Sequence, residues 1–277
     1  MNTYPYPIID FHVHLFPDRM FDAIWKSFVK DYGWDVMYHL YYKECIAYLK
    51  ERGVEKIVYS NYAHKEGVAK HLNDWNLKVL DEQDNVYCFG AYHPDDDIAI
   101  AEDFITHPKV LGFKLQLLVQ KCYPYDTRLF PLYELVQHYK KRILMHVGTG
   151  PVGNEFVGIG GFKKLLRQYP DIPVTIAHMG AYEYDEFLEL LDDYPHLMMD
   201  TAFVFLPDYE GAFHKDPEVL EKYQDRILYG SDFPNIIFPR ELEIETLMKY
   251  GLSKTTLENI LYNNGNRIIR QIVHDDR

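Results

Sequence analysis

The sequence Ile8-Ile9-Asp10-Phe11-His12-Val13-His14 places two histidines, two residues apart, at the end of an apolar run. The run has the character of a buried β-strand, and the Phe16-Pro17-Asp18 segment after it is typical of a turn. Because successive strand side chains point to opposite faces, His12 and His14 share one face and can reach a common point. Two imidazoles placed in this way can bind a divalent cation, although close pairs of histidines also occur by chance.

Further along the chain, short apolar segments with strand character alternate with segments of helical periodicity. After residues 8–11, we expect strands at 55–59, 86–91, 110–115, 143–147, 174–178, 197–200 and 227–230. Alternating strands and helices predict parallel βα units, and eight units predict a closed barrel. The expected fold is therefore a distorted (β/α)8 TIM barrel, with a single domain over residues 1–277.

The alternative is an open, doubly wound parallel sheet. Its phosphate-binding loop would have to be Gly148-Thr149-Gly150-Pro151-Val152-Gly153, but Pro151 and the late start of the next helix fit that motif poorly. We interpret this segment as a flexible loop at the mouth of the barrel. The aromatic-rich stretch from Arg19 to Tyr42 is interpreted as an elaboration after the first strand, either a lid or a dimer contact.

Composition narrows the functional classes. The formal net charge of −13, without a run of Lys and Arg, argues against a nucleic-acid partner. The three cysteines are too few and too scattered for a disulfide framework, which favours a reducing compartment. No leader-like N-terminus or membrane-length apolar run is present, so we expect a cytoplasmic protein without a membrane partner. A small-molecule substrate is the expected partner, and homodimerisation remains open.

Polar residues occur at the expected carboxyl ends of the strands, where a barrel of this kind places its active site. His146 alone is best interpreted as a core residue, but His12, His14, His146 and Asp232 together favour a metal site because isolated buried polar groups are costly. Three imidazoles and one carboxylate suit one divalent ion, with Zn²⁺ favoured over Mn²⁺, Fe²⁺, Co²⁺ or Ni²⁺. The strand-end residues are His12, His14, Lys114, His146, His178 and Asp232.

These residues lie in motifs that resemble the amidohydrolase superfamily, and more narrowly its branch related to aminocarboxymuconate-semialdehyde decarboxylase. The closing segment Asn263-Asn264-Gly265-Asn266-Arg267 is also similar, with Gly265 where alanine is more typical. The resemblance implies a metal ion held by His12, His14, His146 and Asp232, and an acid/base role for His178. The motifs are Asp10-Phe11-His12-Val13-His14, Gly112-Phe113-Lys114-Leu115, Met145-His146-Val147-Gly148, Ala177-His178-Met179-Gly180 and Tyr229-Gly230-Ser231-Asp232-Phe233-Pro234.

The chemistry of these residue types agrees with that implication. A bound divalent cation makes hydroxide available from water at neutral pH, and Asp232 can both ligate the ion and accept a proton. His178 is expected to orient the water or stabilise a developing oxyanion, or otherwise to act only through hydrogen bonds to the ligands.

The role of Lys114 remains open. In binuclear members of the superfamily, a carboxylated lysine at this strand end bridges two metals. We favour one metal ion, with Lys114 contacting the substrate or lying behind the ligands as a cation. Gln116 stands where relatives often have histidine, and it is a second candidate for a substrate contact.

Three functions follow from this pattern. The first is a metal-dependent hydrolase that uses a metal-activated water on a small carboxylated or cyclic substrate, such as an amide or a lactone. The second is a non-oxidative decarboxylase of an aromatic or muconate-like acid, and the third is a non-catalytic metal-binding barrel. The first two differ in what anchors a substrate carboxylate, for which the candidates are Lys114, Arg128 and Arg240. Other strand-end groups are interpreted as loop or packing residues, namely Asn61, Tyr62, His93 and Asp200.

Overall fold

The computed structural model describes residues 4–207, 209 and 211–274. Its eight strands are all parallel and lie in one sheet in the order in which they occur in the chain. The strands are β1 (Ile8–His14), β2 (Val54–Ser60), β3 (Val86–Ala91), β4 (Val110–Gln116), β5 (Arg142–His146), β6 (Val174–Ile176), β7 (Met198–Asp200) and β8 (Ile227–Leu228).

The first strand closes the sheet against the segment that follows β8. The backbone N–H of Phe11 donates to the carbonyl of Tyr229 at 2.9 Å, and that of His14 donates to Phe233 at 2.8 Å. The fold is therefore a single-domain (β/α)8 barrel, as the alternation of segments predicts. The open-sheet alternative is wrong, because an open sheet would leave β1 unpaired on this side.

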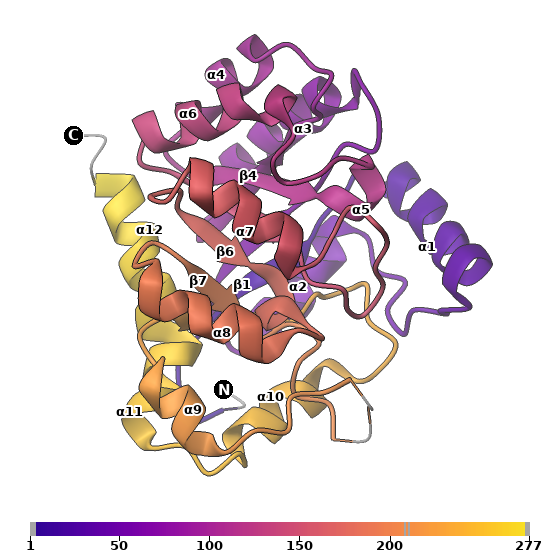
Figure 1. Cartoon of the computed structure of the whole chain (residues 1–277). Helices are drawn as coiled ribbons and strands as arrows, with labels where there is room; N and C mark the ends of the chain where they lie inside the picture. Colours follow the sequence, from indigo (N-terminus) through magenta and orange to yellow (C-terminus); the bar gives the residue numbers. More distant parts are fainter. Residues whose placement is uncertain (1–3, 208, 210, 275–277) are drawn as a thin grey trace.

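Helices cover the outside of the barrel (Figure 1). Their apolar faces pack on the strands in one large core, and Ile268, Ile269 and Ile272 of the last helix cover the interior cluster around Ile9 and Phe11. The helices are α1 (Asp18–Tyr32), α2 (Tyr42–Glu51), α3 (Val68–Glu82), α4 (Ala99–Ile105), α5 (Leu117–Gln120), η1 (Thr127–Leu129), α6 (Phe130–His138), α7 (Ile159–Gln168), η2 (Ala177–Gly180), α8 (Tyr184–Asp193), α9 (Pro217–Lys222), α10 (Arg240–Met248), α11 (Lys254–Glu258), η3 (Asn259–Asn263) and α12 (Asn264–His274).

In strand β1, the side chains do not alternate strictly between the two faces of the sheet near His12. The pairing of β1 with β2 shifts register between Asp10 and Val13, as in a β-bulge. Phe11 packs in the interior cluster with Ile9, and the adjacent His12 is also buried, with Nε2 3.3 Å from Oδ1 of Asp232. The His12 and His14 rings lie together, with centroids 5.1 Å apart, as the sequence spacing predicts.

The sixth strand ends earlier than expected. It stops at Ile176, and His178 lies in the short turn η2 with left-handed backbone angles (φ 56°, ψ 29°). A carboxylate supports this turn: Asp200 accepts a hydrogen bond from the backbone N–H of His178 at 3.1 Å. The strand boundary therefore depends on a residue 22 positions along the chain, which local sequence patterns cannot reveal.

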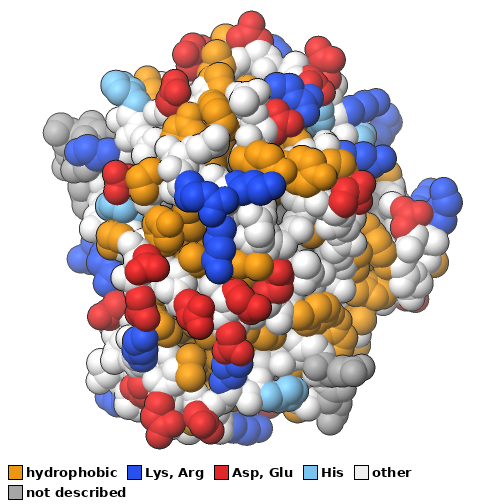
Figure 2. Space-filling view, viewed as in Figure 1, with side chains coloured by type: hydrophobic (Ala, Val, Ile, Leu, Met, Phe, Trp, Pro, Cys, Tyr) orange, Lys and Arg blue, Asp and Glu red, His pale blue; other side chains and the backbone are white. Residues whose placement is uncertain are grey.

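Helix α1 stands apart at one side of the molecule, near α5 (Figure 1). Its Phe21 and Trp25 pack in a small separate cluster with Phe16 and Val36. On the face shown in Figure 2, acidic side chains gather over α8, next to basic side chains of α7. In the part of the chain that the structure describes, no helix is long and apolar enough to span a membrane.

Candidate metal centre at the barrel mouth

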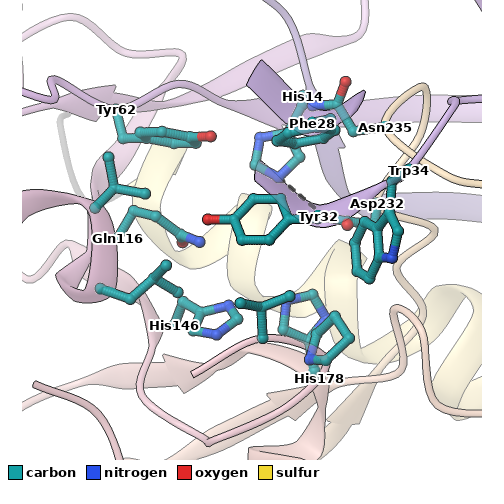
Figure 3. A pocket seen from close by; sticks show the side chains of 14 residues that line it. His14, Phe28, Tyr32, Trp34, Tyr62, Gln116, His146, His178, Asp232 and Asn235 are labelled. Carbon is teal, nitrogen blue, oxygen red and sulfur yellow. Dashed lines mark ion pairs between the residues drawn. The ribbon is translucent and has the colours of Figure 1, made fainter. Parts of the chain in front are cut away.

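A small cavity lies at the carboxyl ends of the strands, with a free volume of about 70 Å³. Figure 3 shows the side chains that converge on it from β1, the segment after β8, the ends of β4 and β5, and the α1 region. It is lined by His14, Phe28, Tyr32, Trp34, Tyr62, Gln116, Leu118, Val119, His146, Pro151, Val152, His178, Asp232 and Asn235.

His12, His14 and Asp232 form a compact group of possible metal ligands. Their donor atoms lie within 4.8 Å of one another. Oδ1 of Asp232 is 2.9 Å from Nε2 of His14 and 3.3 Å from Nε2 of His12. Asp232 reaches this position from a left-handed conformation (φ 58°), and its backbone N–H donates to the His12 carbonyl at 2.8 Å. The backbone therefore ties the carboxylate directly to the histidine strand.

The orientation of His12 is set by Asp200 at the end of β7. Nδ1 of His12 lies 2.9 Å from Oδ2 of Asp200, with both side chains fully buried. Burial is the main cause that holds the pKa of His12 well below its ordinary value, and the Lys114 charge adds to the effect. The neutral ring therefore donates its Nδ1 proton to Asp200 and keeps the lone pair of Nε2 for the site.

Asp200 itself is a site residue that sequence reasoning missed. Its Oδ1 accepts from the backbone N–H groups of His178 and Ala202, at 3.1 and 3.2 Å. Burial raises the pKa of Asp200 to about 6, against the opposing effects of His178 and Lys114. The available signal was a lone carboxylate that ends the apolar run Leu197-Met198-Met199, where an unpaired buried charge would be costly.

The two remaining histidines lie across the cavity from β1. The ring centroid of His178 is 4.9 Å from that of His146 and 5.1 Å from that of His12. Nδ1 of His178 lies 2.9 Å from the Ala202 carbonyl, so its Nε2 is the atom left for the cavity that His178 lines. His146 stands outside the most compact ligand groups. Burial holds its pKa well below the ordinary value, with His178 as the next cause.

The donor atoms fit a divalent cation. Both ring nitrogens of His146 are buried and have no hydrogen-bond partner among the described residues. Oδ1 of Asp232 likewise accepts no aligned hydrogen bond within the described chain, and it faces the Nε2 lone pair of His12. Two acceptors in contact repel each other unless a cation lies near them. Nζ of Lys114 is one such cation, 3.3 Å from Nε2 of His12, and imidazole with carboxylate is also a donor set that Zn²⁺ and similar ions prefer.

The two candidate substrate contacts lie in different environments. Lys114 is fully buried, does not line the cavity, and places Nζ 3.3 Å from Nε2 of His12. Burial lowers its pKa to about 8, although Asp200 and Asp232 oppose this shift. Gln116 lines the cavity, and its buried Oε1 has no partner in the described part of the chain. Of the two, Gln116 is the residue placed to meet a bound molecule.

The arginines considered as carboxylate anchors do not line this cavity. Arg128 is exposed and pairs with Asp95 and Asp126. Arg240 is buried and pairs with Asp10 at 3.1 Å. Of the strand-end residues interpreted as packing, Tyr62 does line the cavity, whereas Asn61 is held in a buried network with Asn76.

The segment after β1 covers the cavity. Phe28 and Tyr32 of α1, together with Trp34 after it, form part of the wall (Figure 3). The Trp34 ring stacks on Phe203, with centroids 5.7 Å apart and planes 10° apart. Of the two interpretations of this elaboration, the lid agrees with these positions.

Comparison with known proteins adds the family. A family model described as amidohydrolase matches residues 9–271 of the chain. None of the curated proteins matches at a significant level.

Several solved structures have the same fold. An uncharacterised TIM-barrel protein from Bordetella bronchiseptica matches with 18% sequence identity and a TM-score of 0.71, over 96% of this chain and 99% of that chain. A 5-carboxyvanillate decarboxylase from Novosphingobium aromaticivorans, complexed with manganese and 4-hydroxy-3-methoxy-5-nitrobenzoic acid, matches with 14% identity and a TM-score of 0.65, over 96% of each chain.

A third structure is a probable 2-pyrone-4,6-dicarboxylic acid hydrolase from Acinetobacter baumannii, with citric acid bound. It has 15% identity and a TM-score of 0.63, over 95% of this chain and 98% of that chain. At such identities these likenesses concern the fold, whereas the family model covers nearly the whole sequence. The chain belongs to the amidohydrolase family, and the motifs from Asp10 to Asp232 lie within the part that the family model matches.

Proposed function

We propose that this amidohydrolase is a hydrolase of small molecules with an uncharged carbonyl group, such as lactones, esters or cyclic amides. The observation that supports this choice is the charge of the cavity wall. Among the described residues that line it, none is a lysine or an arginine, and Asp232 is an acid. A substrate carboxylate would find no cationic side chain there, whereas a neutral carbonyl requires none.

One divalent ion would be held by His12, His14, His146 and Asp232, with Zn²⁺ favoured and Mn²⁺, Fe²⁺, Co²⁺ or Ni²⁺ as alternatives. When bound, such an ion supplies a Lewis acid that activates water for attack on a carbonyl group.

The protein residues supply the proton transfers and the orientation. His14 and His12 hold the pKa of Asp232 below its ordinary value, although burial alone would raise it, so the carboxylate stays ionised and can accept a proton from the attacking water. Nδ1 of His178 donates to the Ala202 carbonyl, which leaves the Nε2 lone pair free to take up the proton that Asp232 accepts from the water and to pass it to the leaving group. Gln116 offers a side-chain amide to orient the substrate.

A decarboxylase is the second candidate, and the aromatic wall favours it. Phe28, Tyr32, Trp34 and Tyr62 would pack on the two faces and the edge of an aromatic acid. The third function, a non-catalytic metal barrel, predicts no cavity beside the ligands, and the cavity at His146 and His178 argues against it.

A substrate panel separates the two reactions. The protein, loaded with Zn²⁺ or Mn²⁺, would be assayed with a neutral lactone (dihydrocoumarin), with 2-pyrone-4,6-dicarboxylic acid and with 5-carboxyvanillate. We expect ring opening of the neutral lactone, abolished in His178→Asn and retained in the surface control His196→Asn. Release of carbon dioxide from 5-carboxyvanillate without lactone hydrolysis would overturn the proposal in favour of the decarboxylase.

A further inference from the structure

A second cavity lies directly beside the site, between α1 and the mouth of the barrel, with a free volume of about 400 Å³. We call it the side chamber. Its walls come from one face of α1, from the segments after β1 and β2, and from α5. It is lined by Phe16, Arg19, Met20, Ala23, Ile24, Ser27, Phe28, Tyr32, Tyr62, His64 and Val119.

The side chamber is continuous in its lining with the site cavity. Phe28, Tyr32, Tyr62 and Val119 line both spaces. Figure 3 shows the Tyr32 and Tyr62 hydroxyl groups directed into the site, so their rings form the boundary between the two. A molecule that reacts at His178 and extends beyond these rings would therefore enter the side chamber.

The volumes argue that a substrate must use both spaces. The site cavity, at about 70 Å³, holds only a few water molecules. Sites for small organic ligands occupy roughly 300–1,000 Å³, which the side chamber supplies and the site cavity does not. The reacting group fits beside the histidines, and the rest of the substrate needs the adjoining space.

The chemistry of the side chamber selects an apolar group. Met20, Ile24 and Phe28 of α1 are only half-buried, so this face of the helix has apolar surface that the described residues leave uncovered. No carboxylate lines the side chamber within the described chain, although the net charge of the protein is −13. Its titratable groups are the exposed Arg19 and His64, together with the phenols of Tyr32 and Tyr62.

We propose that the side chamber binds an apolar arm of the substrate, an aryl or alkyl group attached to the carbonyl compound that reacts at the metal centre. This inference rests on the proposed function for the identity of the reacting group. The arm-binding step itself depends only on the walls of the side chamber.

The test compares ligands that differ only in the arm. The metal-loaded protein would be titrated calorimetrically with 3-methylcyclopentanone and with 3-hexylcyclopentanone, which are neutral cyclic carbonyl compounds that hydrolysis cannot consume. Because each buried methylene strengthens binding several-fold, we expect the hexyl compound to bind at least about tenfold more tightly. Equal affinity for the two ketones would overturn the inference.

Matched variants locate the arm. Ala23→Trp places an indole in the side chamber. Lys26→Trp is the control, because it places an indole on the same helix at a position that does not line the side chamber. We expect the preference for the hexyl compound to be lost in Ala23→Trp and kept in Lys26→Trp. Ser27→Trp fills the same space from the next turn and serves if Ala23→Trp does not fold. A preference that persists in a folded filling variant would show that the arm lies elsewhere.

Hydrolysis is measured separately, with γ-valerolactone and γ-decalactone as substrates. A hexyl preference in ketone binding without turnover of either lactone would contradict the proposed hydrolase and leave the side chamber supported. Turnover of both lactones with the same kcat/KM, together with equal affinities for the two ketones, would support the hydrolase. It would refute the inference that the side chamber binds the arm.

Discussion

Asp200 accepts a hydrogen bond from Nδ1 of His12 at 2.9 Å while its other oxygen accepts from the backbone N–H of His178. One buried carboxylate thus sets the ring orientation of a proposed metal ligand and the backbone position of the proposed acid/base residue. The residue ends β7, whereas His12 belongs to β1 and His178 follows β6. The barrel brings the three together, and four predictions follow from this geometry and its surroundings.

Asp200→Asn should weaken metal binding. An amide that donates to Nδ1 would put the His12 proton on Nε2, which then cannot ligate. Removing a carboxylate that orients a ligand histidine typically costs roughly 10–100-fold in metal affinity. Competition with a chromophoric chelator measures the loss, and Asp193→Asn, at an exposed position of α8, provides the control. An unchanged affinity in Asp200→Asn would separate Asp200 from the metal centre.

Metal content should distinguish the roles of His146 and Lys114. We expect elemental analysis to give about one zinc-like ion per chain, because one carboxylate and three histidines suffice for one site. His146→Ala should lose the ion. Lys114→Met, which preserves the volume of the buried side chain, should keep it. About two ions per chain, with one lost in Lys114→Met, would instead indicate a carboxylated lysine bridging two metals.

Gly230→Ala should disturb the site, because a Cβ at this position would lie 2.6 Å from the Cβ of His12. We expect His12 to be displaced and metal affinity to fall, with only a small change in helix content measured by circular dichroism. Gly160→Ala in α7 is the matched control: its Cβ would meet nothing within 4 Å. That variant should keep full metal affinity and lose no stability, because alanine is the better helix former in this first turn of α7.

Glu243 should make the stability of the protein depend on pH. This residue of α10 is buried, and its Oε1 accepts from the backbone N–H groups of Val204 and Phe205 at 2.5 and 3.1 Å. Burial is the main cause that raises its pKa well above the ordinary value, against the effect of those hydrogen bonds. The folded state therefore holds a proton that the unfolded chain releases at its ordinary, lower pKa.

The free energy of unfolding consequently falls as pH rises from the ordinary glutamate pKa toward the raised one, and below both values Glu243 contributes no pH dependence. Glu243→Gln removes this contribution. Relative to the wild type, the variant should therefore gain stability between pH 5 and pH 8, as measured by urea denaturation at each pH. Parallel pH profiles for the two proteins would mean that Glu243 titrates normally in the fold.

Much of the fold was predictable from the chain. The eight apolar segments are separated by helical patterns, and period and order alone specify parallel βα units. The prediction placed His12, His14, His146 and Asp232 at strand ends because chain order maps directly onto position in a parallel barrel. The exact end of β6 was not predictable, since it depends on a hydrogen bond from Asp200.

The sequence by itself determined the barrel and the family, because local periodicity and strand-end motifs depend on residues close together in the chain. Only the tertiary structure decided the surroundings of the motifs. It brought Asp200 to His12 across 188 residues, buried Lys114 beneath the ligands and turned Arg240 toward Asp10. It also laid α1 over the mouth to enclose the side chamber. These contacts form between segments that are distant in the sequence. The free energy of burying a charge or an apolar face depends on which segments pack around it, and local sequence patterns do not contain that information.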